Sequence, residues 1–319
     1  METGESLWRK FHFWCAPMEG VMRGALLAAC NRLQLAESWL TPFLRISQNV
    51  PQASQIRDFM APFEPEKRPV VLQLMGVDPV KMAECARAAV ALGAAGIDLN
   101  LGCPSRQVTR RGAGAGGLRP EYRETAFRVA EALREALPEG RFSIKMRSGW
   151  ESFGEFPALL GELTRRAAPD AVTVHFRTAR EGYRPVPERL ERFAAVGRLA
   201  GASQPLWLLN GDLTGEAEIR RLMRETGASG AMLGRGFWRD PWILRRLAHP
   251  EGDFPVPEAG RRLLWHAVLT EMRRGGKLPP RGKAVEWAHL ILGADAPAAR
   301  SLRRLSDADF PRWLEGAPE

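Results

Sequence analysis

The chain has 319 residues, of which 45% are hydrophobic and 26% are charged, the composition of a globular protein with a sizeable core. Its 46 Lys and Arg residues against 37 Asp and Glu residues give a formal net charge of +9, which favours a polyanionic partner such as nucleic acid. No apolar stretch is long enough to span a membrane, and the N-terminal segment METGESLWRKFHFW contains no signal-type apolar run. We therefore expect no membrane partner.

Four cysteines limit the redox and metal chemistry of the chain. They form no CxxC pair and no His/Cys ligand spacing, so no metal site is expected. Four thiols are too few for a disulfide framework, which indicates a reducing compartment, the cytoplasm. Cys15, Cys30 and Cys85 lie in apolar or alanine-rich patterns and are expected to pack as small hydrophobic residues.

Eight short apolar runs recur in the first 236 residues. Their near-continuous apolar character predicts strands that are covered on both faces, as in a parallel sheet. The predicted strands are FHFWCAPM (11–18), SWLTPFLR (38–45), PVVLQLMG (69–76), GIDLNLGCP (96–104), FSIKMRSGW (142–150), AVTVHFRT (171–178), PLWLLNGD (205–212) and GAMLGRG (230–236).

Helical patterns separate most of these runs. Segment 78–93 opens with an Asp cap and a Pro and ends in Gly, 119–137 is amphipathic, and 214–227 opens with Thr and closes in Gly. The alternation of strands and helices predicts an α/β fold, a (β/α)8 TIM barrel over residues 1–248. A doubly wound sheet is the competing architecture, but it usually has fewer strands and a nucleotide fingerprint near its start.

The pattern changes after Pro250. A Pro/Gly-rich linker, EGDFPVPEAG, leads into helical patterns only. Residues 261–304 contain ten Lys or Arg residues against three Asp or Glu residues, a local net charge of +7. We therefore expect a small, basic, all-helical C-terminal domain over residues 249–319 that holds the polyanionic partner. A solvated, charged helix face is the alternative explanation of such a run.

In barrel enzymes, the residues that act on the substrate gather at the carboxyl ends of the strands. The predicted strands end almost without exception in polar residues or glycines, and this agreement in position indicates one site. The candidate residues are Pro17, Met18, Glu19, Gln73, Asn100, Cys103, Lys145, Arg147, His175, Arg177, Asn210, Gly211, Asp212, Gly234 and Arg235.

The ends of the last two strands predict a phosphate site. Loops after these strands of a barrel commonly hold phosphate, with glycine backbone N–H groups approaching it and a cation beside it, and the sequence has NGD at 210–212 and GRG at 234–236. A phosphorylated cofactor is therefore expected there. Gln73 and Asn100 offer amide groups to a flat heterocycle, and Lys145 offers a cation for the negative charge of a reduced ring.

Cys103 lies past the end of a predicted strand and directly before Pro104, in a loop. A thiol in such a place suits proton donation to a carbon atom, in which case it stays protonated until the substrate arrives. It also suits nucleophilic attack, with His175 as the neighbouring base. The residues alone leave both roles open.

The loop that follows contains the glycine-rich stretch RGAGAGG at 111–117. It matches the GxGxxG pattern, but polar residues rather than a strand precede it, so it is not a dinucleotide fingerprint. Arg106, Arg110 and Arg111 beside these glycines predict a flexible lid that closes on a phosphate backbone. A plain flexible surface loop is the alternative.

Seven motifs, APMEGV, LQLMG, DLNLGCPS, IKMRSGW, VHFRTAREGY, LNGD and GRG, occur in this order. Together they resemble the motif set of the flavin-dependent tRNA-dihydrouridine synthases over roughly residues 13–240. PMEGV and RTAREGYR look closest to the bacterial C-type subgroup, which modifies position 16 in the D-loop of tRNA. The chain departs from the family pattern after the cysteine, where it reads GAGAGGL and the family reads closer to GGGAxLL.

The resemblance implies an FMN-dependent oxidoreductase that reduces the C5=C6 bond of a tRNA uridine. NADPH or NADH reduces FMN, the reduced flavin gives hydride to C6, and Cys103 gives a proton to C5. The residues implied to bind FMN are Pro17, Met18, Glu19, Gln73, Lys145, His175, Asn210, Gly211, Asp212, Gly234 and Arg235. Those implied to bind the RNA are Asn100, Arg147, Arg177, Arg106, Arg110 and Arg111.

The expected partner is therefore tRNA, and the chain is expected to act as a monomer without a metal. Two other functions fit parts of the pattern. An FMN barrel that reduces a free small molecule, such as a dihydroorotate or ene reductase, shares the fold and the flavin but does not need the basic C-terminal segment. A barrel that has lost catalysis and only binds RNA would be colourless when purified.

Overall fold

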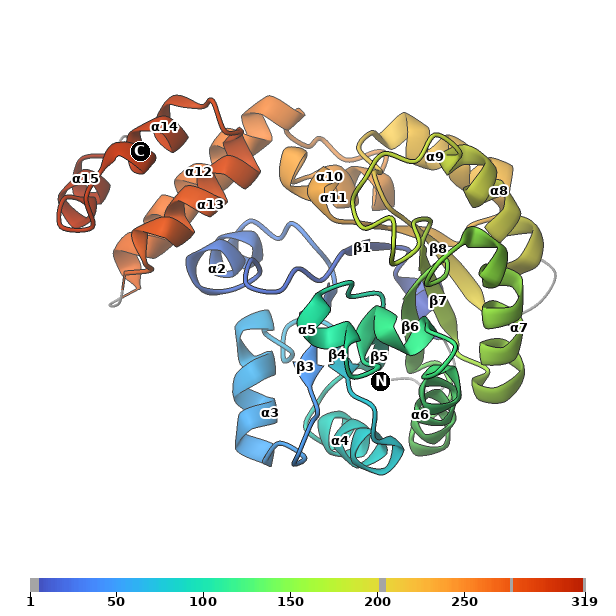
Figure 1. Cartoon of the computed structure of the whole chain (residues 1–319). Coiled ribbons are helices and arrows are strands. Elements are labelled where there is room, and N and C mark those ends of the chain that lie inside the picture. The colour runs from blue at the N-terminus through green and yellow to red at the C-terminus, as the bar shows by residue number, and fades with distance from the viewer. Residues whose placement is uncertain (1–5, 201–204, 276–277, 318–319) are drawn as a thin grey trace.

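The computed structural model describes residues 6–200, 205–275 and 278–317, and its parallel strands form a nearly closed barrel (Figure 1). The strands follow one another around the barrel in the order β1-β9-β8-β7-β6-β5-β4-β2, and β3 also pairs with β4. Their bounds are β1 (Phe13–Cys15), β2 (Trp39–Leu40), β3 (Leu44–Arg45), β4 (Val70–Met75), β5 (Gly96–Leu101), β6 (Phe142–Arg147), β7 (Ala171–His175), β8 (Leu206–Asn210) and β9 (Gly230–Leu233).

Each of the eight predicted runs contains an observed strand, which confirms the α/β barrel. The second run forms two short strands, β2 and β3, because Pro42 between them has no N–H to give to the ladder. On either side of this proline the pairing with β4 continues: the Thr41 N–H donates to the Val71 carbonyl at 3.0 Å, and the Ile46 N–H donates to the Met75 carbonyl at 2.8 Å.

The helices of this part of the chain lie mostly around the outside of the barrel (Figure 1). Their bounds are α1 (Leu7–Lys10), α2 (Gly24–Arg32), α3 (Ala53–Met60), α4 (Pro79–Ala91), α5 (Arg106–Thr109), α6 (Arg123–Ala136), α7 (Phe156–Ala167), α8 (Arg189–Ala200), α9 (Glu216–Thr226), α10 (Arg235–Arg239) and α11 (Ile243–Ala248), with short 3₁₀ turns η1 (Ala61–Phe63), η2 (Gly114–Leu118) and η3 (Phe153–Glu155).

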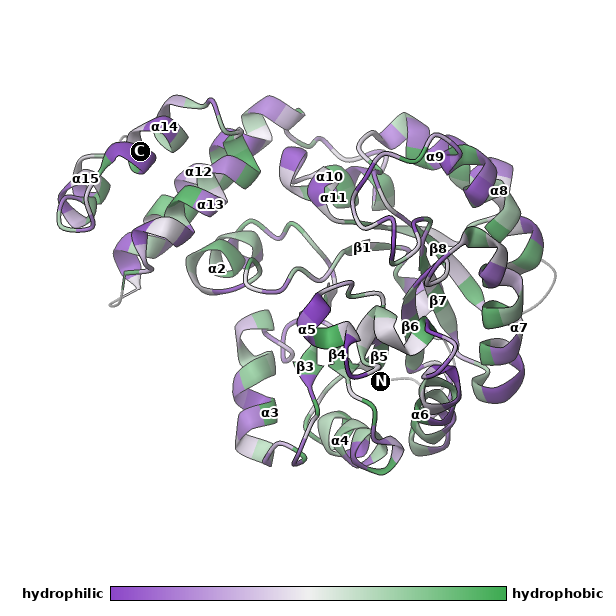
Figure 2. Ribbon diagram, viewed as in Figure 1, coloured by the Kyte–Doolittle hydropathy of each residue, from purple (hydrophilic) through white to green (hydrophobic). Residues whose placement is uncertain are grey.

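The capping signals in the sequence mark where these helices begin and end. The Asp78 carboxylate accepts from the Val80 and Lys81 N–H groups and so caps α4. Gly227, with a φ of +70°, ends α9 in the left-handed conformation that glycine tolerates best. The strands are mostly hydrophobic, and the outer helices alternate hydrophobic and hydrophilic residues (Figure 2), as expected for elements that cover a buried sheet on one side only.

The inside of the barrel contains an apolar cluster and a row of polar side chains. The buried apolar cluster includes Trp14, Leu40, Val71, Ala171, Leu208 and Met232. In the polar row, Gln73 of β4 pairs in register with Asp98 of β5, and Asp98 pairs with Ser143 of β6. All three are fully buried.

Among the described residues after the barrel, the regular elements are all helices, as predicted (Figure 1). They are α12 (Pro257–Arg274), α13 (Arg281–Leu292), α14 (Pro297–Arg304) and α15 (Phe310–Gly316). The first of them begins inside the predicted linker, because Pro257 fits the first turn of a helix. The predicted range 249–319 includes residues 276–277 and 318–319, which lie outside the described residues.

The C-terminal helices pack on the barrel through apolar and polar contacts. α12 packs against α2, and Val268 and Trp287 belong to the same buried apolar cluster as the helices around the barrel. The Lys283 Nζ donates to the Gly20 carbonyl at 2.9 Å. In the part of the chain that the structure describes, no helix is both long enough and apolar enough to cross a membrane.

Candidate active site

A cavity of about 570 Å³ opens at the carboxyl ends of the strands, within the size range of small-molecule and cofactor sites. It also contains Tyr183, Thr214 and Arg239, which the sequence pattern did not single out. The predicted site residues that line it are Pro17, Met18, Lys145, His175, Asn210, Gly211, Asp212, Gly234 and Arg235.

One end of this cavity is positively charged. The Asp212 carboxylate lies between two arginines: it accepts from Arg177 Nη2 and from Arg235 Nη2, each at 2.6 Å. Burial opposes ionisation of Asp212, but the hydrogen bond and charge of Arg177 outweigh it, so the pKa of Asp212 is lowered. Arg239 is exposed and, among the described residues, has no ion pair. This end suits an anion.

Glycines let the backbone converge at the same end. At Gly236 an added Cβ would lie 2.0 Å from the Leu213 carbonyl oxygen. Gly211 has a φ of +116°, and its Cβ would lie 2.6 Å from the Phe176 ring. By contrast, a Cβ on Gly234 would meet only Ala16, at 3.8 Å, and so would extend into open cavity. The glycines thus form the cradle of backbone that a phosphate group requires.

The other end of the cavity is lined by Lys145, His175 and Asn210. The Lys145 Nζ donates to Asn210 Oδ1 at 3.1 Å, and the Asn210 Nδ2 donates to the Met232 carbonyl at 2.7 Å. Burial lowers the pKa of Lys145 to about 8, and the negative charge of Asp98 partly offsets this. Lys145 therefore remains a cation at neutral pH.

His175 is neutral and has a defined tautomer. Burial, followed by the charge of Arg147, lowers the pKa of His175 well below its usual value. The Arg177 N–H donates to His175 Nδ1 at 3.2 Å, so the ring proton is on Nε2. His175 thus presents an N–H donor. Among the described residues no hydrogen bond joins it to Cys103, and the role of base to a nucleophilic Cys103 gains no support.

Cys103 is half-buried, and hydrogen bonds of its backbone N–H and carbonyl groups fix its position. Its N–H donates to Asn100 Oδ1 at 2.9 Å, and its carbonyl accepts from the Ala115 N–H at 3.0 Å. Burial raises the pKa of the Cys103 thiol and outweighs the opposing hydrogen bond from the Ser105 backbone. The thiol is therefore protonated at neutral pH, the state that a proton donor needs.

The glycine-rich stretch after Cys103 does not form the expected flexible lid. Residues 112–118 are buried, and η2 packs against α5. A Cβ on Gly116 would lie 2.6 Å from the Thr109 carbonyl oxygen, so these glycines serve close packing. Both sequence interpretations, a lid and a plain flexible loop, are wrong about the glycines. The three neighbouring arginines are exposed, as expected: Arg106, Arg110 and Arg111.

Gln73 and Asn100 are not among the residues that line the cavity. Gln73 is fully buried, and both atoms of its amide are engaged, Nε2 with Asp98 and Oε1 with Asn100. The sequence pattern led us to expect both amides to face a heterocycle and did not single out Asp98. Glu19 is exposed and lies outside the cavity lining.

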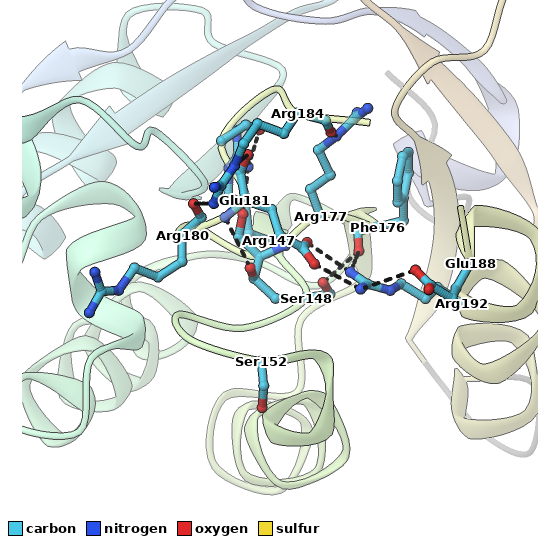
Figure 3. Close-up of polar contacts among 12 residues, drawn as sticks. Arg147, Ser148, Ser152, Phe176, Arg177, Arg180, Glu181, Arg184, Glu188 and Arg192 are labelled. Atoms are coloured by element: carbon cyan, nitrogen blue, oxygen red, sulfur yellow. Dashed lines mark hydrogen bonds and ion pairs between the residues drawn. The ribbon is translucent and has the colours of Figure 1, made fainter. Parts of the chain in front are cut away.

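Arg147 connects the loops after β5 and β7, and Figure 3 shows it among residues of the loop after β7. Its Nε donates to the Gly102 carbonyl at 3.0 Å, and its Nη1 donates to the carbonyls of Thr178 at 2.7 Å and Gly182 at 2.8 Å. The family resemblance placed this guanidinium on the substrate. Its observed contacts are instead with the backbone of the loops after β5 and β7, so it shapes the cavity mouth.

The loop after β7 presents an aromatic side chain at the cavity. Glu181 accepts from both terminal nitrogens of Arg192 at 2.8 Å, and this pair anchors the loop (Figure 3). Tyr183 is 68% exposed, and its ring lies 5.5 Å from the Arg147 guanidinium. The aromatic residue in REGY was the signal in the sequence that could have identified it.

A parallel barrel with a polar cavity at the carboxyl ends of its strands has the architecture of a barrel enzyme. The family described as dihydrouridine synthase (Dus) matches residues 14–272. The chain therefore belongs to the dihydrouridine synthase family.

Curated relatives match along most of their length. The tRNA-dihydrouridine synthase B of Pseudomonas aeruginosa is 29% identical over 309 residues, which cover 92% of this chain and 88% of the relative. The tRNA-dihydrouridine(16) synthase of Haemophilus ducreyi is 32% identical over 287 residues, which cover 86% and 85%. The tRNA-dihydrouridine(16) synthase of Salmonella typhimurium is 31% identical over 252 residues, which cover 76% and 78%.

Solved structures share the barrel at low identity. A crystal structure of TcOYE with pHBA matches with a TM-score of 0.56 and 10% identity, covering 82% of this chain and 94% of that one. A variant of NCR from Zymomonas mobilis matches with a TM-score of 0.53 and 14% identity, covering 86% and 93%. At these identities the likeness shows the fold alone.

Proposed function

We propose that the chain is a tRNA-dihydrouridine synthase that reduces the C5=C6 bond of a D-loop uridine, at position 16. The observation that carries this proposal is a protonated thiol, Cys103, held at the rim of a barrel whose neighbouring cavity suits a phosphorylated ring, in a chain of the dihydrouridine synthase family. The names of several relatives support position 16.

The cavity residues fit FMN. The glycine cradle with Arg235 and Arg239 would hold its phosphate, and Lys145 and His175 would bond its ring. When bound and reduced by NADPH or NADH, FMN supplies the hydride that C6 of the uracil accepts. Because a flavin and a thiol suffice for this reduction, no metal is required.

The protein's own side chains supply the rest of the chemistry. Cys103 gives its proton to C5 as hydride reaches C6, so that the net addition is two hydrogens. Negative charge that develops on a uracil carbonyl during this transfer needs N–H donors in a dry site. Lys145, as a cation, and His175, through its Nε2–H, are donors of this kind in the cavity.

The uridine must leave its stack to reach the cavity, which costs a few kcal/mol and costs less in a loop than in a duplex. We propose that residues 1–248 are catalytic and residues 249–319 help to hold the tRNA. The exposed arginines Arg106, Arg110 and Arg111 lie directly after β5, at the cavity end of the barrel, where phosphates of the D-arm would pass. The enzyme would act in the cytoplasm as a monomer.

The test is direct mapping of the product. The purified protein is expected to carry FMN, identified by absorbance and chromatography after release. With NADPH and an unmodified tRNA transcript, it should form dihydrouridine at position 16, located by mass spectrometry; a transcript with cytidine at that position is the control. Absence of product with a flavin-loaded protein contradicts the proposal. Reduction of free orotate or of enones would favour the small-molecule reductase. A protein that is colourless and binds RNA would favour the barrel without catalysis.

A further inference from the structure

One fully buried carboxylate has no role in the mechanism above. Asp98 lies in the middle of β5, facing the barrel interior, and none of its surface is exposed. Among the described residues it forms no salt bridge; the nearest charge that acts on it is Lys145 of β6. Burial raises the pKa of Asp98 to about 6, so it is ionised in most molecules at neutral pH. Burying a carboxylate without a contacting cation costs folding free energy, so we looked for a function that this group serves.

Asp98 ends a chain of hydrogen bonds that reaches Cys103. The Gln73 Nε2 donates to Asp98 Oδ2 at 2.7 Å, and the Asn100 Nδ2 donates to Gln73 Oε1 at 2.8 Å. Asn100 Oδ1 accepts the Cys103 N–H at 2.9 Å and the Gly102 N–H at 3.0 Å. The second oxygen of Asp98 accepts from the Ser143 hydroxyl, so both carboxylate oxygens are used.

Every link of this chain has one allowed direction. The backbone N–H groups of Gly102 and Cys103 can only donate, which turns the oxygen of Asn100 toward them. The NH₂ group of Asn100 then faces Gln73, whose oxygen must accept. The remaining NH₂ of Gln73 needs a pure acceptor, and an ionised carboxylate is one. A flipped Gln73 would set donor against donor at Asn100 and oxygen against oxygen at Asp98.

We propose that Asp98 is a positioning residue for the reduction: through Gln73 and Asn100, its carboxylate fixes the backbone of Cys103 and thereby the place of the thiol. The chemistry of this inference rests on the proposed function. It explains why the amide of Gln73 is engaged inside the barrel, and it gives a use to a buried charge that an apolar or amide side chain would replace at lower cost in stability.

The test variant is Asp98→Asn, which keeps the shape of the side chain. The introduced amide can still offer its oxygen to the Gln73 NH₂ group, but as a neutral acceptor, and its own NH₂ then faces the Ser143 hydroxyl. The hydrogen bond that anchors the chain is therefore weaker than one to a carboxylate. We expect kcat for dihydrouridine formation to fall on the order of 10- to 100-fold, as for small misplacements of reacting groups, while KM for tRNA stays within about threefold because Asp98 touches no substrate.

A second readout needs no turnover. Cys103 is half-buried, whereas the other three cysteines are buried, so iodoacetamide should label it first. If Asp98 holds its backbone, Asp98→Asn should change the labelling rate of Cys103 several-fold, followed by peptide mass spectrometry. The matched control is Glu162→Gln, the same carboxylate-to-amide change on the outer face of α7 at a side chain paired with Arg165; it should leave kcat and labelling unchanged.

Gln73→Met breaks the same chain at the next link and keeps the apolar volume. If Asp98 acts through Gln73, the double variant should lose no more kcat than the more severe single variant; independent losses that multiply would overturn the proposal. So would parent-like kcat and parent-like labelling in Asp98→Asn. If Asp98→Asn does not fold by circular dichroism, the labelling rate of Gln73→Met decides: a change supports the proposal and an unchanged rate overturns it. If the parent protein forms no dihydrouridine, the proposed function fails, and the labelling comparison still decides the role of Asp98.

Discussion

The barrel and the C-terminal helices each contain a cavity of similar volume, about 570 Å³ and about 590 Å³. In the barrel, side chains from several strands converge on the space, among them Lys145, His175 and Asp212. The cavity among the helices is lined largely by apolar groups such as Leu292 and Trp313. Volume alone therefore does not distinguish the two cavities; the convergence of polar groups with shifted pKa values makes the barrel cavity the candidate active site.

Most of the net positive charge lies in the barrel and not in the C-terminal helices, although the basic stretch 261–304 indicated the opposite. Residues 261–304 are basic, but the whole range 249–319 has eleven Lys or Arg residues and ten Asp or Glu residues. Residues 1–248 contain thirty-five and twenty-seven, so nearly all of the net positive charge belongs to the barrel. Attraction of a polyanion is thus expected from the barrel rim as well as from the helices.

The largest expected effect concerns the chemistry at the barrel mouth. Cys103→Ala should retain FMN but lose dihydrouridine formation on the order of 10²- to 10⁴-fold, the usual contribution of a general acid. Absorbance of the bound flavin and mass-spectrometric counting of dihydrouridine measure the two properties. The control is Cys85→Ala, at a buried thiol of α4 that does not line the cavity, which should keep turnover. Parent-like turnover in Cys103→Ala would remove the proposed proton donor.

Filling each cavity in turn sharpens the comparison further. Gly234→Ala adds a methyl group that meets only Ala16 in the protein, so the fold should tolerate it while FMN loses space. Overpacking typically costs ~1–3 kcal/mol, which corresponds to a Kd for FMN about 5- to 150-fold higher. The matched change in the helical cavity is Ala298→Val, which should leave the Kd unchanged. Equal effects of both variants, measured by flavin fluorescence titration, would contradict the assignment of the cofactor site.

The division of RNA binding between the two regions is tested with charge. Deleting residues 251–319 would uncover the apolar face of α2 that α12 covers, so point variants are preferable. Replacing three rim arginines by alanine (Arg106, Arg110 and Arg111), and separately three helix arginines (Arg261, Arg303 and Arg304), should each weaken tRNA binding. The slope of log Kobs against log salt is negative, and it should become shallower by ~0.7–0.9 for each tRNA phosphate that a variant no longer neutralises. An unchanged slope in either variant would exclude that region from binding the phosphates.

The strand pattern could be predicted because the strands of this barrel are covered on both faces, so their sequences are almost continuously apolar. The carboxyl ends of the strands also brought many of the predicted site residues together: nine of them line one cavity. The interruption at Pro42 followed from the missing N–H of proline and was visible in SWLTPFLR, although the strand was predicted as one.

What each polar side chain contacts was beyond the sequence pattern. Gln73 lies within β4 and faces a buried carboxylate, whereas Arg147 ends β6 and binds backbone carbonyls of two loops. The hydrogen-bond partner of each side chain depends on which neighbouring strand or loop supplies an acceptor, and that neighbour is distant in sequence. The glycines of residues 112–117 were taken as flexible because flexibility and close packing select the same residue type.

The smallest expected effect is a pH dependence. It should affect the end of the barrel cavity that contains Lys145 more than the end that contains the arginines. Lys145 has a pKa lowered to about 8 by burial, so it is a cation below that pH and loses its proton above it. If its charge supports the reduction, kcat should be level near pH 7 and fall by about tenfold per pH unit well above pH 8. FMN retention should fall less, because the arginines at the other end stay charged and still hold the phosphate. Lys145→Arg keeps the cation at higher pH and should move the decline upward, at some loss of kcat from altered geometry. A parent protein whose kcat holds constant to about pH 9.5 would show that this cation does not act in the rate-limiting step.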